Sequence, residues 1–288
     1  MHRYIGLFRQ NISGFLAASC VVVFLGTPGL ASSQITTTDQ LSGKLVITGS
    51  STVAPLIAEI GKRFERLYPK VRVDVQTGGS SRGVADARQG LADLGMVSRG
   101  MKAEEKDLHF FPVARDGVGL IVHKDNPVQT LTDEQVIAIY TGKITNWKDV
   151  GGKDAPITVV NKAEGRSTLE LFLHYFKLKN TDVKAQVVIG DNEQGVKTVA
   201  GNRNAIGYVS IGTAEYDESQ GVPIQLLPVG EVAASTETVQ NGTFPLSRPL
   251  HIITRTPPAG LAKAFIDFAQ SKAVHDIIKQ QYFVPLGD

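Results

Sequence analysis

Apolar positions along the chain follow two alternating periods, one of two residues and one of about 3.6 residues. Strands are predicted at 44–50, 71–78 and 92–98, and a short helix closed by Gly90 is predicted at 81–90. Between the first two strands, six apolar residues recur at helical spacing before Pro69 ends the helix: Val53, Leu56, Ile57, Ile60, Phe64 and Leu67. The resulting order of strand, helix, strand, helix and strand is typical of a parallel sheet.

The second part of the chain repeats this alternation after one long extended run. Residues 110–127 form the run, and we expect a break at Asp116–Gly117 where the chain crosses between two lobes. Beyond it we expect a capped helix from Thr132, a strand, polar loop and helix over 156–176, strands at 205–210 and 248–254, and one long closing helix over 260–280. The predicted fold class is α/β, with two lobes that are each a mostly parallel sheet flanked by helices and are joined by two crossing strands.

The N-terminal residues 1–31 differ from the rest of the chain. They begin with basic residues, continue with a mostly apolar stretch at 12–25, and end with the small residues Gly29-Leu30-Ala31. This pattern predicts a secretory signal peptide and a periplasmic mature protein. A membrane span is the alternative, but the stretch of about 14 residues is shorter than the roughly 20 that a span needs.

Cys20 raises a second alternative, because LAASC at 16–20 resembles a lipoprotein box. The residues that follow, 21–25, are all apolar, whereas a lipid-attached cysteine is normally followed by a polar tether. We therefore disfavour lipoprotein anchoring through Cys20. This cysteine is the only one in the chain, so the mature protein must be stabilised by its core and not by disulfides.

The net charge also changes when the signal peptide is removed. The full chain has 30 basic and 28 acidic residues, and the two arginines within 1–31 leave a mature chain with 28 of each. This balance does not indicate binding to nucleic acid.

Small polar loops follow four of the predicted strands. They lie at 48–52 (TGSST), 77–84 (TGGSSRGV), 97–100 (VSRG) and 164–170 (EGRSTLE), and three of them open a helix. Ligands of parallel α/β sheets bind at the carboxyl ends of the strands, where such loops lie. Several helix N-termini are therefore expected to converge on one site.

The loop chemistry suits a small oxyanion. Each helix N-terminus carries unpaired N–H groups and about half a positive charge, so three of them supply roughly +1.5. Arg166 or Lys162 can add a full charge, and hydroxyls can replace the hydration shell of the anion. Arg166 is unfavourable for the dipole at a helix start, which indicates another role for it.

Other interpretations remain open for single loops. A serine or threonine can simply cap a helix, and Arg99 and Lys162 can be ordinary paired or surface residues. The segment 79–83 matches G-x-S-x-G, the nucleophile elbow of hydrolases, and five histidines follow it, so a secreted serine hydrolase remains an alternative. That alternative leaves the other three loops unexplained.

Metal and sugar sites are disfavoured by residue content. The histidines are scattered and do not form an H-E-x-x-H motif or pair with cysteines, so we expect no metal and no cofactor. The single tryptophan, Trp147, is expected to pack within the protein, so the chain does not offer the aromatic platforms of a sugar receptor.

The chain resembles the phosphate-binding receptors of bacterial ABC transporters over about residues 44–285, in the sequences of six segments and in their order. The segments are TGSSTVAPL, GGSSRGV, ADLGMVSR, IYTGKITNWKDVGG, EGRSTLELF and AIGYVS. The resemblance implies a two-lobed periplasmic binding protein of type II that closes on inorganic phosphate and delivers it to transmembrane permease subunits. It also implies a monomer without enzymatic activity, with lobe I at 36–116 plus 246–288 and lobe II at 117–245.

The resemblance also implies a set of phosphate ligands, which we list with the basic candidates of the loops: Ser51, Thr52, the backbone of Val53, Ser80, Ser98, Arg99, Lys162, Arg166, Ser167 and Thr168. Many family members have Asp at the position of Ser98, where it accepts the proton of phosphate. The fourth loop also departs from the family pattern R-A-D-G-S-G-T, because it reads KAEGRST at 162–168. These departures leave a receptor for sulfate or arsenate, or an adhesion protein on the same scaffold, as alternatives, and they suggest a preference for the phosphate dianion.

Overall fold

The computed structural model describes residues 41–287 of the chain. The predicted signal peptide, its cleavage site and Cys20 lie outside these residues, so the predictions about them stay predictions. Within 41–287, no helix combines the length and the apolar character that a membrane span requires.

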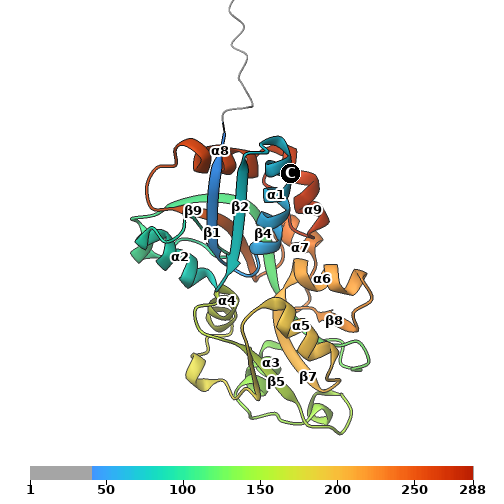
Figure 1. Ribbon diagram of the computed structural model, residues 1–288. Helices are drawn as coiled ribbons and strands as arrows, with labels where there is room; N and C mark the ends of the chain where they lie inside the picture. The colour runs from blue at the N-terminus through green and yellow to red at the C-terminus, as the bar shows by residue number, and fades with distance from the viewer. Residues whose placement is uncertain (1–40, 288) are drawn as a thin grey trace, which may run out of the picture. The chain divides into compact units, whose positions relative to one another are not determined.

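The described residues alternate between strands and helices, as the sequence pattern predicts (Figure 1). The strands are β1 (Gly43–Gly49), β2 (Val71–Thr77), β3 (Leu94–Val97), β4 (His109–His123), β5 (Thr158–Lys162), β6 (Val187–Ile189), β7 (Ala205–Ser210), β8 (Ile224–Leu227) and β9 (Ser247–Thr254). The helices are α1 (Ala54–Leu67), α2 (Ser80–Gln89), α3 (Asp133–Tyr140), α4 (Ser167–Tyr175), α5 (Asn192–Ala200), α6 (Ile211–Ser219), α7 (Thr236–Gln240), α8 (Gly260–Ala269) and α9 (His275–Gln280). Short 3-10 turns lie at η1 (Ala103–Glu105), η2 (Trp147–Val150), η3 (Asn180–Asp182) and η4 (Lys272–Val274).

The strands pair in the order β2-β1-β3-β9-β4-β7-β5-β6, and β8 pairs with β4. At one end of this order β1 runs parallel to β2 and β3, and at the other end β5 runs parallel to β6 and β7. The strands between these ends, β9 and β4, are antiparallel to their neighbours. The predicted α/β class with parallel sheets and flanking helices is confirmed.

The long strand β4 belongs to both parts of this arrangement (Figure 1). Its residues 109–117 pair with β9 and its residues 118–122 pair with β7. The predicted break at Asp116–Gly117 is therefore wrong, because the strand is continuous and only its partner changes there. Gly117 allows this passage, since a Cβ at this position would lie 2.7 Å from Cδ1 of Ile211.

The two largest hydrophobic clusters occupy different parts of the chain. One draws its buried residues from 45–114 and 250–283, and includes Phe64 and Phe265. The other draws them from 118–246 together with Val284, and includes Trp147 and Tyr208. Trp147 is buried, as expected, and its indole N–H donates to the carbonyl of Asn204.

Several elements differ from the sequence prediction. The predicted closing helix over 260–280 is wrong as a single helix, because α8 ends at Ala269 and a 3-10 turn separates it from α9. Ser271 explains the interruption, since its hydroxyl donates to the carbonyl of Phe268 and offers the backbone an alternative to the next helical turn. The helices α5, α6 and α7 and the strands β6 and β8 were not predicted.

Candidate functional site

A buried ion pair lies where β4 and β9 run side by side. Asp116 of β4 is the register partner of Arg248 of β9, and both side chains are almost fully buried. Nη2 and Nε of Arg248 lie 2.8 Å and 3.1 Å from Oδ2 of Asp116. A buried charge of this kind persists only when it is paired and hydrogen-bonded, and Asp116 supplies the pairing.

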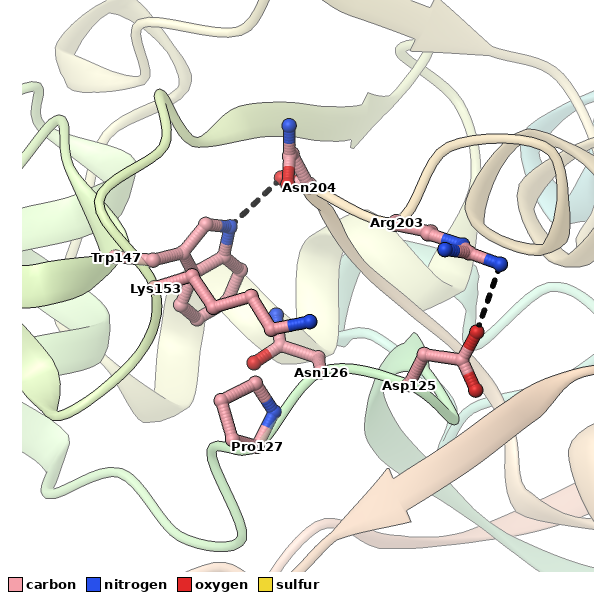
Figure 2. A pocket seen from close by; sticks show the side chains of 7 residues that line it. All are labelled: Asp125, Asn126, Pro127, Trp147, Lys153, Arg203 and Asn204. Carbon is pink, nitrogen blue, oxygen red and sulfur yellow. Dashed lines mark hydrogen bonds and ion pairs between the residues drawn. The ribbon is translucent and has the colours of Figure 1, made fainter.

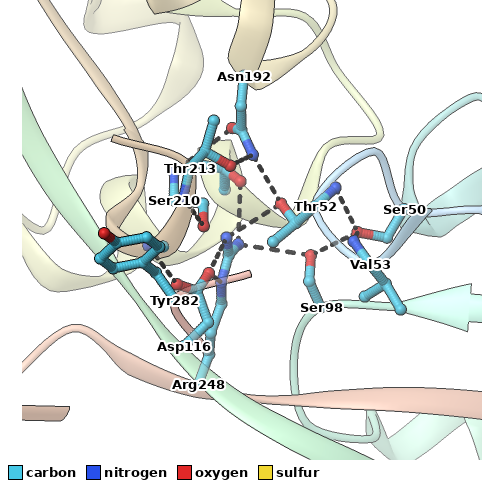
Figure 3. A network of polar contacts seen from close by, with 12 residues as sticks. Ser50, Thr52, Val53, Ser98, Asp116, Asn192, Ser210, Thr213, Arg248 and Tyr282 are labelled. Atoms are coloured by element: carbon cyan, nitrogen blue, oxygen red, sulfur yellow. Dashed lines mark hydrogen bonds and ion pairs between the residues drawn. The ribbon is translucent and has the colours of Figure 1, made fainter. Parts of the chain in front are cut away.

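The outer nitrogens of Arg248 meet three hydroxyls from three different loops (Figure 3). Nη1 donates to Oγ1 of Thr168 at 2.9 Å and, at a longer 3.4 Å, to Oγ of Ser98. Nη2 donates to Oγ1 of Thr52 at 3.1 Å. The predicted convergence of the loops thus centres on an arginine that the sequence analysis did not single out.

Ser50 organises the first loop. Its hydroxyl donates to Oγ of Ser98 at 2.9 Å and accepts the backbone N–H groups of Thr52 and Val53 at 3.2 and 3.4 Å. Ser80, at the start of α2, accepts the backbone N–H of Ser98 at 3.2 Å. The excess of hydroxyls at 48–52 therefore serves two purposes, since one residue caps the turn before α1 and another points its hydroxyl at Arg248.

Two glycines let these loops approach each other closely. Gly49 adopts a φ of +134° at the end of β1, and a Cβ there would lie 2.4 Å from the carbonyl oxygen of Met96. Gly79 adopts a φ of +96°, and its Cβ would lie 2.7 Å from the carbonyl oxygen of Gly165. That same carbonyl accepts the N–H of Ser81 at 3.2 Å, so the second and fourth loops are in direct contact.

Lys162 extends the cluster on the side of β5. Its side chain is buried, and Nζ donates to Oδ1 of Asn192 at 2.9 Å. The amide nitrogen of Asn192 donates in turn to Oγ1 of Thr52, the hydroxyl that Arg248 also contacts (Figure 3). Lys162 is thus linked to this hydroxyl through Asn192. Burial and the charge of Arg248 lower the pKa of Lys162 to about 7, and the charge of Arg166 adds to this effect while that of Asp191 opposes it.

The fourth loop holds two polar atoms that are buried and have no hydrogen-bond partner among residues 41–287. They are Oγ of Ser167 and Nε of Arg166. An unpaired polar group inside a protein is costly, and such groups need a specific reason. Both atoms are hydrogen-bond donors between Lys162 at the end of β5 and Thr168 in the first turn of α4, and an anion bound there would satisfy them.

Arg99 is oriented differently from the other predicted ligands. Its guanidinium forms two hydrogen bonds with the carboxylate of Glu105, at 2.6 and 2.7 Å, and an ion pair with Glu170. The structure therefore directs its charge to carboxylates and not to the cluster around Arg248.

Ser51 lies at the edge of the cluster and lines a cavity of about 300 Å3. Apolar residues (Ala54, Pro55, Ala58 and Val75) and polar residues, among them Asn192, line this cavity. A second, smaller cavity lies elsewhere, between Trp147, Lys153 and an ion pair of Asp125 with Arg203 (Figure 2). Within the described residues, the histidine, cysteine and carboxylate side chains do not form a group that could hold a metal ion.

The main residues missed by sequence reasoning are Ser50, Asp116, Asn192 and Arg248. Asn192 had a detectable signal, because Asp191-Asn192 follow a strand and open a helix in the same way as the predicted loops. Arg248 had none, since it lies within a predicted strand and is brought to the site by the pairing of β9 with β4.

The fold and the buried polar cluster define a binding protein of the periplasmic type. A model of the PBP superfamily domain matches residues 34–273. The phosphate-binding protein PstS of Pseudomonas aeruginosa is 31% identical over 281 residues, covering 85% of this chain and 84% of that protein. PstS of Bacillus subtilis is 29% identical over 257 residues, covering 87% of this chain and 83% of that protein.

Solved structures lead to the same family. A substrate-binding protein assigned to phosphate ABC transport in Clostridium perfringens, crystallised with bound phosphate, superposes with a TM-score of 0.78. It is 34% identical to this chain and covers 85% of this chain and 100% of its own length. The chain belongs to the PBP superfamily and, within it, to the family of the phosphate-binding proteins PstS.

Proposed function

We propose that the protein is an extracytoplasmic receptor that captures inorganic phosphate and delivers it to an ABC permease. The observation that carries this proposal is the buried guanidinium of Arg248, whose outer nitrogens meet hydroxyls of Thr52, Ser98 and Thr168. These groups come from four segments that are distant in the sequence. A dehydrated oxyanion is stable only where such donors and charges replace its hydration shell.

The charges around the cluster support an anion as the ligand. Lys162, Arg166 and Arg248 bring positive charge, and Asp116 neutralises only the last of them by direct contact. The donors without partners, Ser167 Oγ and Arg166 Nε, add two unused hydrogen bonds. A bound phosphate supplies both the missing negative charge and the missing acceptors.

We propose that Ser51, Thr52, Val53, Ser80, Ser98, Lys162, Arg166, Ser167 and Thr168 surround the phosphate together with Arg248. The hydroxyls of Thr52, Ser98 and Thr168 already lie around this guanidinium. Ser98 is uncharged, so it cannot repel sulfate as an aspartate would. We therefore expect this protein to prefer the phosphate dianion. We also expect it to discriminate less sharply against sulfate and arsenate than a receptor with aspartate at this position does.

We further propose that the chain forms two lobes, at 36–116 plus 246–288 and at 117–245, which close on the ligand. The separate hydrophobic clusters support this division, as does the change of partner along β4 near Gly117. Closure excludes water and strengthens every hydrogen bond in the site. Small-angle scattering should show a smaller radius of gyration with phosphate, and an unchanged radius at saturation would contradict closure.

The remaining features of the proposal concern the cellular setting. We propose a monomer without affinity for nucleic acid that is secreted through the signal peptide at 1–31 and works in the periplasm. The equal numbers of acidic and basic residues after residue 31 support the lack of affinity for nucleic acid. Mass spectrometry of the secreted protein tests secretion through the signal peptide, with an N-terminus near Ser32 expected and a lipid-modified Cys20 as the contrary result.

Calorimetric titration of the purified protein with phosphate, sulfate, arsenate and molybdate tests the proposed ligand. We expect saturable binding of one phosphate per chain without any turnover. A chromogenic ester assay addresses the hydrolase alternative, because Ser81 occupies the nucleophile position of the segment 79–83. Ester hydrolysis that is lost in Ser81→Ala, with no anion binding, would contradict the receptor.

A further inference from the structure

Arg99 is held between two carboxylates that come from different parts of the chain. Its Nη1 and Nη2 donate to the two carboxylate oxygens of Glu105 at 2.7 and 2.6 Å. Its Nε lies 3.1 Å from Oε2 of Glu170, in an ion pair that lacks hydrogen-bond geometry. Lys102 adds a second cation, since its Nζ lies 3.0 Å from the same oxygen of Glu170.

The ion pair of Arg99 with Glu105 is buried and is held by further hydrogen bonds. The Glu105 side chain is 4% exposed and the Arg99 side chain 11% exposed, and Glu105 also accepts the backbone N–H of Lys102. Burial alone would raise the pKa of Glu105, but the hydrogen bonds from Arg99 and Lys102 hold it below its ordinary value. The carbonyl of Arg99 is tied to Nδ1 of His251 at 3.0 Å, which anchors this turn to β9.

Glu170 belongs to the other part of the chain. It lies in the first turn of α4, next to Leu169 and near Phe172, both of which pack in the hydrophobic cluster of residues 118–246. Its side chain is 30% exposed, so the contact with Arg99 forms at the margin of the protein and not in its core. The ion pair with Glu170 joins Arg99 to α4, whereas Glu105 lies on the same side as Arg99.

We propose that Arg99, pre-organised by Glu105, forms a clasp with Glu170 that holds the closed receptor and thereby slows the release of bound anion. The proposal rests on the proposed function, because it assigns these residues to the closure that retains phosphate. Opening breaks the contact with Glu170 while the pair with Glu105 stays intact. The clasp therefore adds its energy to the closed state alone, which makes Arg99 and Glu170 positioning residues that do not contact the ligand.

Glu170→Gln tests the clasp, because it removes the charge and keeps the size and shape of the side chain. The release rate can be measured by chasing bound radiolabelled phosphate with excess unlabelled phosphate. We expect this variant to release phosphate roughly five to thirty times faster than wild type. This range lies between the typical contributions of exposed and of buried charged contacts. The association rate should change less than about twofold, since the contact is absent while phosphate enters. Glu170→Asp, which keeps the charge, should restore part of the retention.

Asp107→Asn is the matched control, because it removes the charge of a carboxylate that accepts two hydrogen bonds from Arg88, and this pair does not involve α4. It should leave both rates unchanged, and the phosphate-free form of Glu170→Gln should unfold at nearly the wild-type temperature. Wild-type release from Glu170→Gln would overturn the clasp and leave the phosphate receptor intact. A wild-type protein that does not bind phosphate would overturn the proposed function and the clasp with it.

Discussion

Arg248 and Asp116 are register partners on β9 and β4, and they form an ion pair in which neither side chain is more than 2% exposed. The pair lies where β4 changes its neighbour from β9 to β7, which is also where we place the crossing between the lobes. Because Asp116 holds Nε and Nη2 on one side, the outer edge of the guanidinium is presented to the hydroxyls of the loops. The same contact thus fixes the strands and orients the main cation of the site.

Replacing Arg248 with glutamine should remove phosphate binding and destabilise the fold. The variant leaves the carboxylate of Asp116 buried and unpaired, a change that typically costs about 3–5 kcal/mol. We expect affinity for phosphate to fall by more than about a hundredfold, since a charged hydrogen bond and its neighbours are lost together. Calorimetric titration and urea unfolding measure the two effects.

The double variant Asp116→Asn with Arg248→Met separates these effects. It removes both charges from the buried pair, so most of the stability should return. Binding should not return, because the cation of the site is still absent. Wild-type affinity in the double variant would show that Arg248 serves the fold alone.

Lys162 should make the stability of the phosphate-free protein depend on pH. Its pKa is about 7 in the folded chain, below the ordinary value of 10.5, so between these values the unfolded chain binds a proton that the folded chain does not. Stability should therefore rise with pH across this window. Lys162→Met should show a smaller rise. The measurement is the free energy of unfolding of wild type and of Lys162→Met as a function of pH, and parallel curves for the two proteins would contradict the assignment.

Phosphate should flatten this rise, because a bound anion favours the charged form of Lys162. The wild-type protein should consequently take up protons on binding at a pH above about 7. Titrations in buffers with different heats of ionisation measure that uptake. The proton uptake should be smaller in Lys162→Met. This variant should also bind phosphate more weakly.

Arg166→Ala should weaken phosphate binding by roughly 10- to 150-fold, the equivalent of about 1.5–3 kcal/mol for a hydrogen bond to a charged group. The unpaired Nε of Arg166 and its effect on the pKa of Lys162 place its charge near the cluster. Arg82→Ala is the control, because the Arg82 side chain is 55% exposed and pairs with Asp86 within α2. An effect of less than about twofold for Arg166→Ala would mean that this arginine does not contact the anion.

Much of the fold could be predicted from the sequence, because its signals are local. The helical spacing from Val53 to Leu67 and the alternation at 71–78 each determine one element, and the structure has both. The helices α5, α6 and α7 were missed since they hold fewer apolar positions than α3 and α4. The closing helix was predicted too long because its apolar spacing continues through Ser271, whose side-chain hydrogen bond to the Phe268 carbonyl gave no signal in that spacing.

The site was predictable only where it follows strand ends. Thr52, Ser98 and Thr168 were predicted as candidates because each lies in a polar loop after a strand, and Lys162 because it is the last residue before such a loop. The structure brings all four into one network. Arg248 reaches the network through a strand pairing between residues more than a hundred positions apart, which no local pattern encodes.

Ser98→Asp should sharpen the rejection of sulfate. The hydroxyl of Ser98 accepts a hydrogen bond from Ser50 and a longer one from Arg248, so its position faces the cluster. A carboxylate there can accept the proton of phosphate and repels a fully ionised anion. The ratio of sulfate to phosphate dissociation constants should rise by at least about tenfold, equal to 1.4 kcal/mol, and an unchanged ratio in competition titrations would contradict the assignment.

Phosphorus NMR of the protein with less than one equivalent of phosphate tests the central claim most directly. A phosphate held in a dry cage around Arg248 should give a separate resonance in slow exchange, because release requires the loops to part. Its chemical shift should not follow the titration of free phosphate near neutral pH, and the resonance should be absent in Arg248→Gln. A single averaged signal that titrates as free phosphate does would contradict the account.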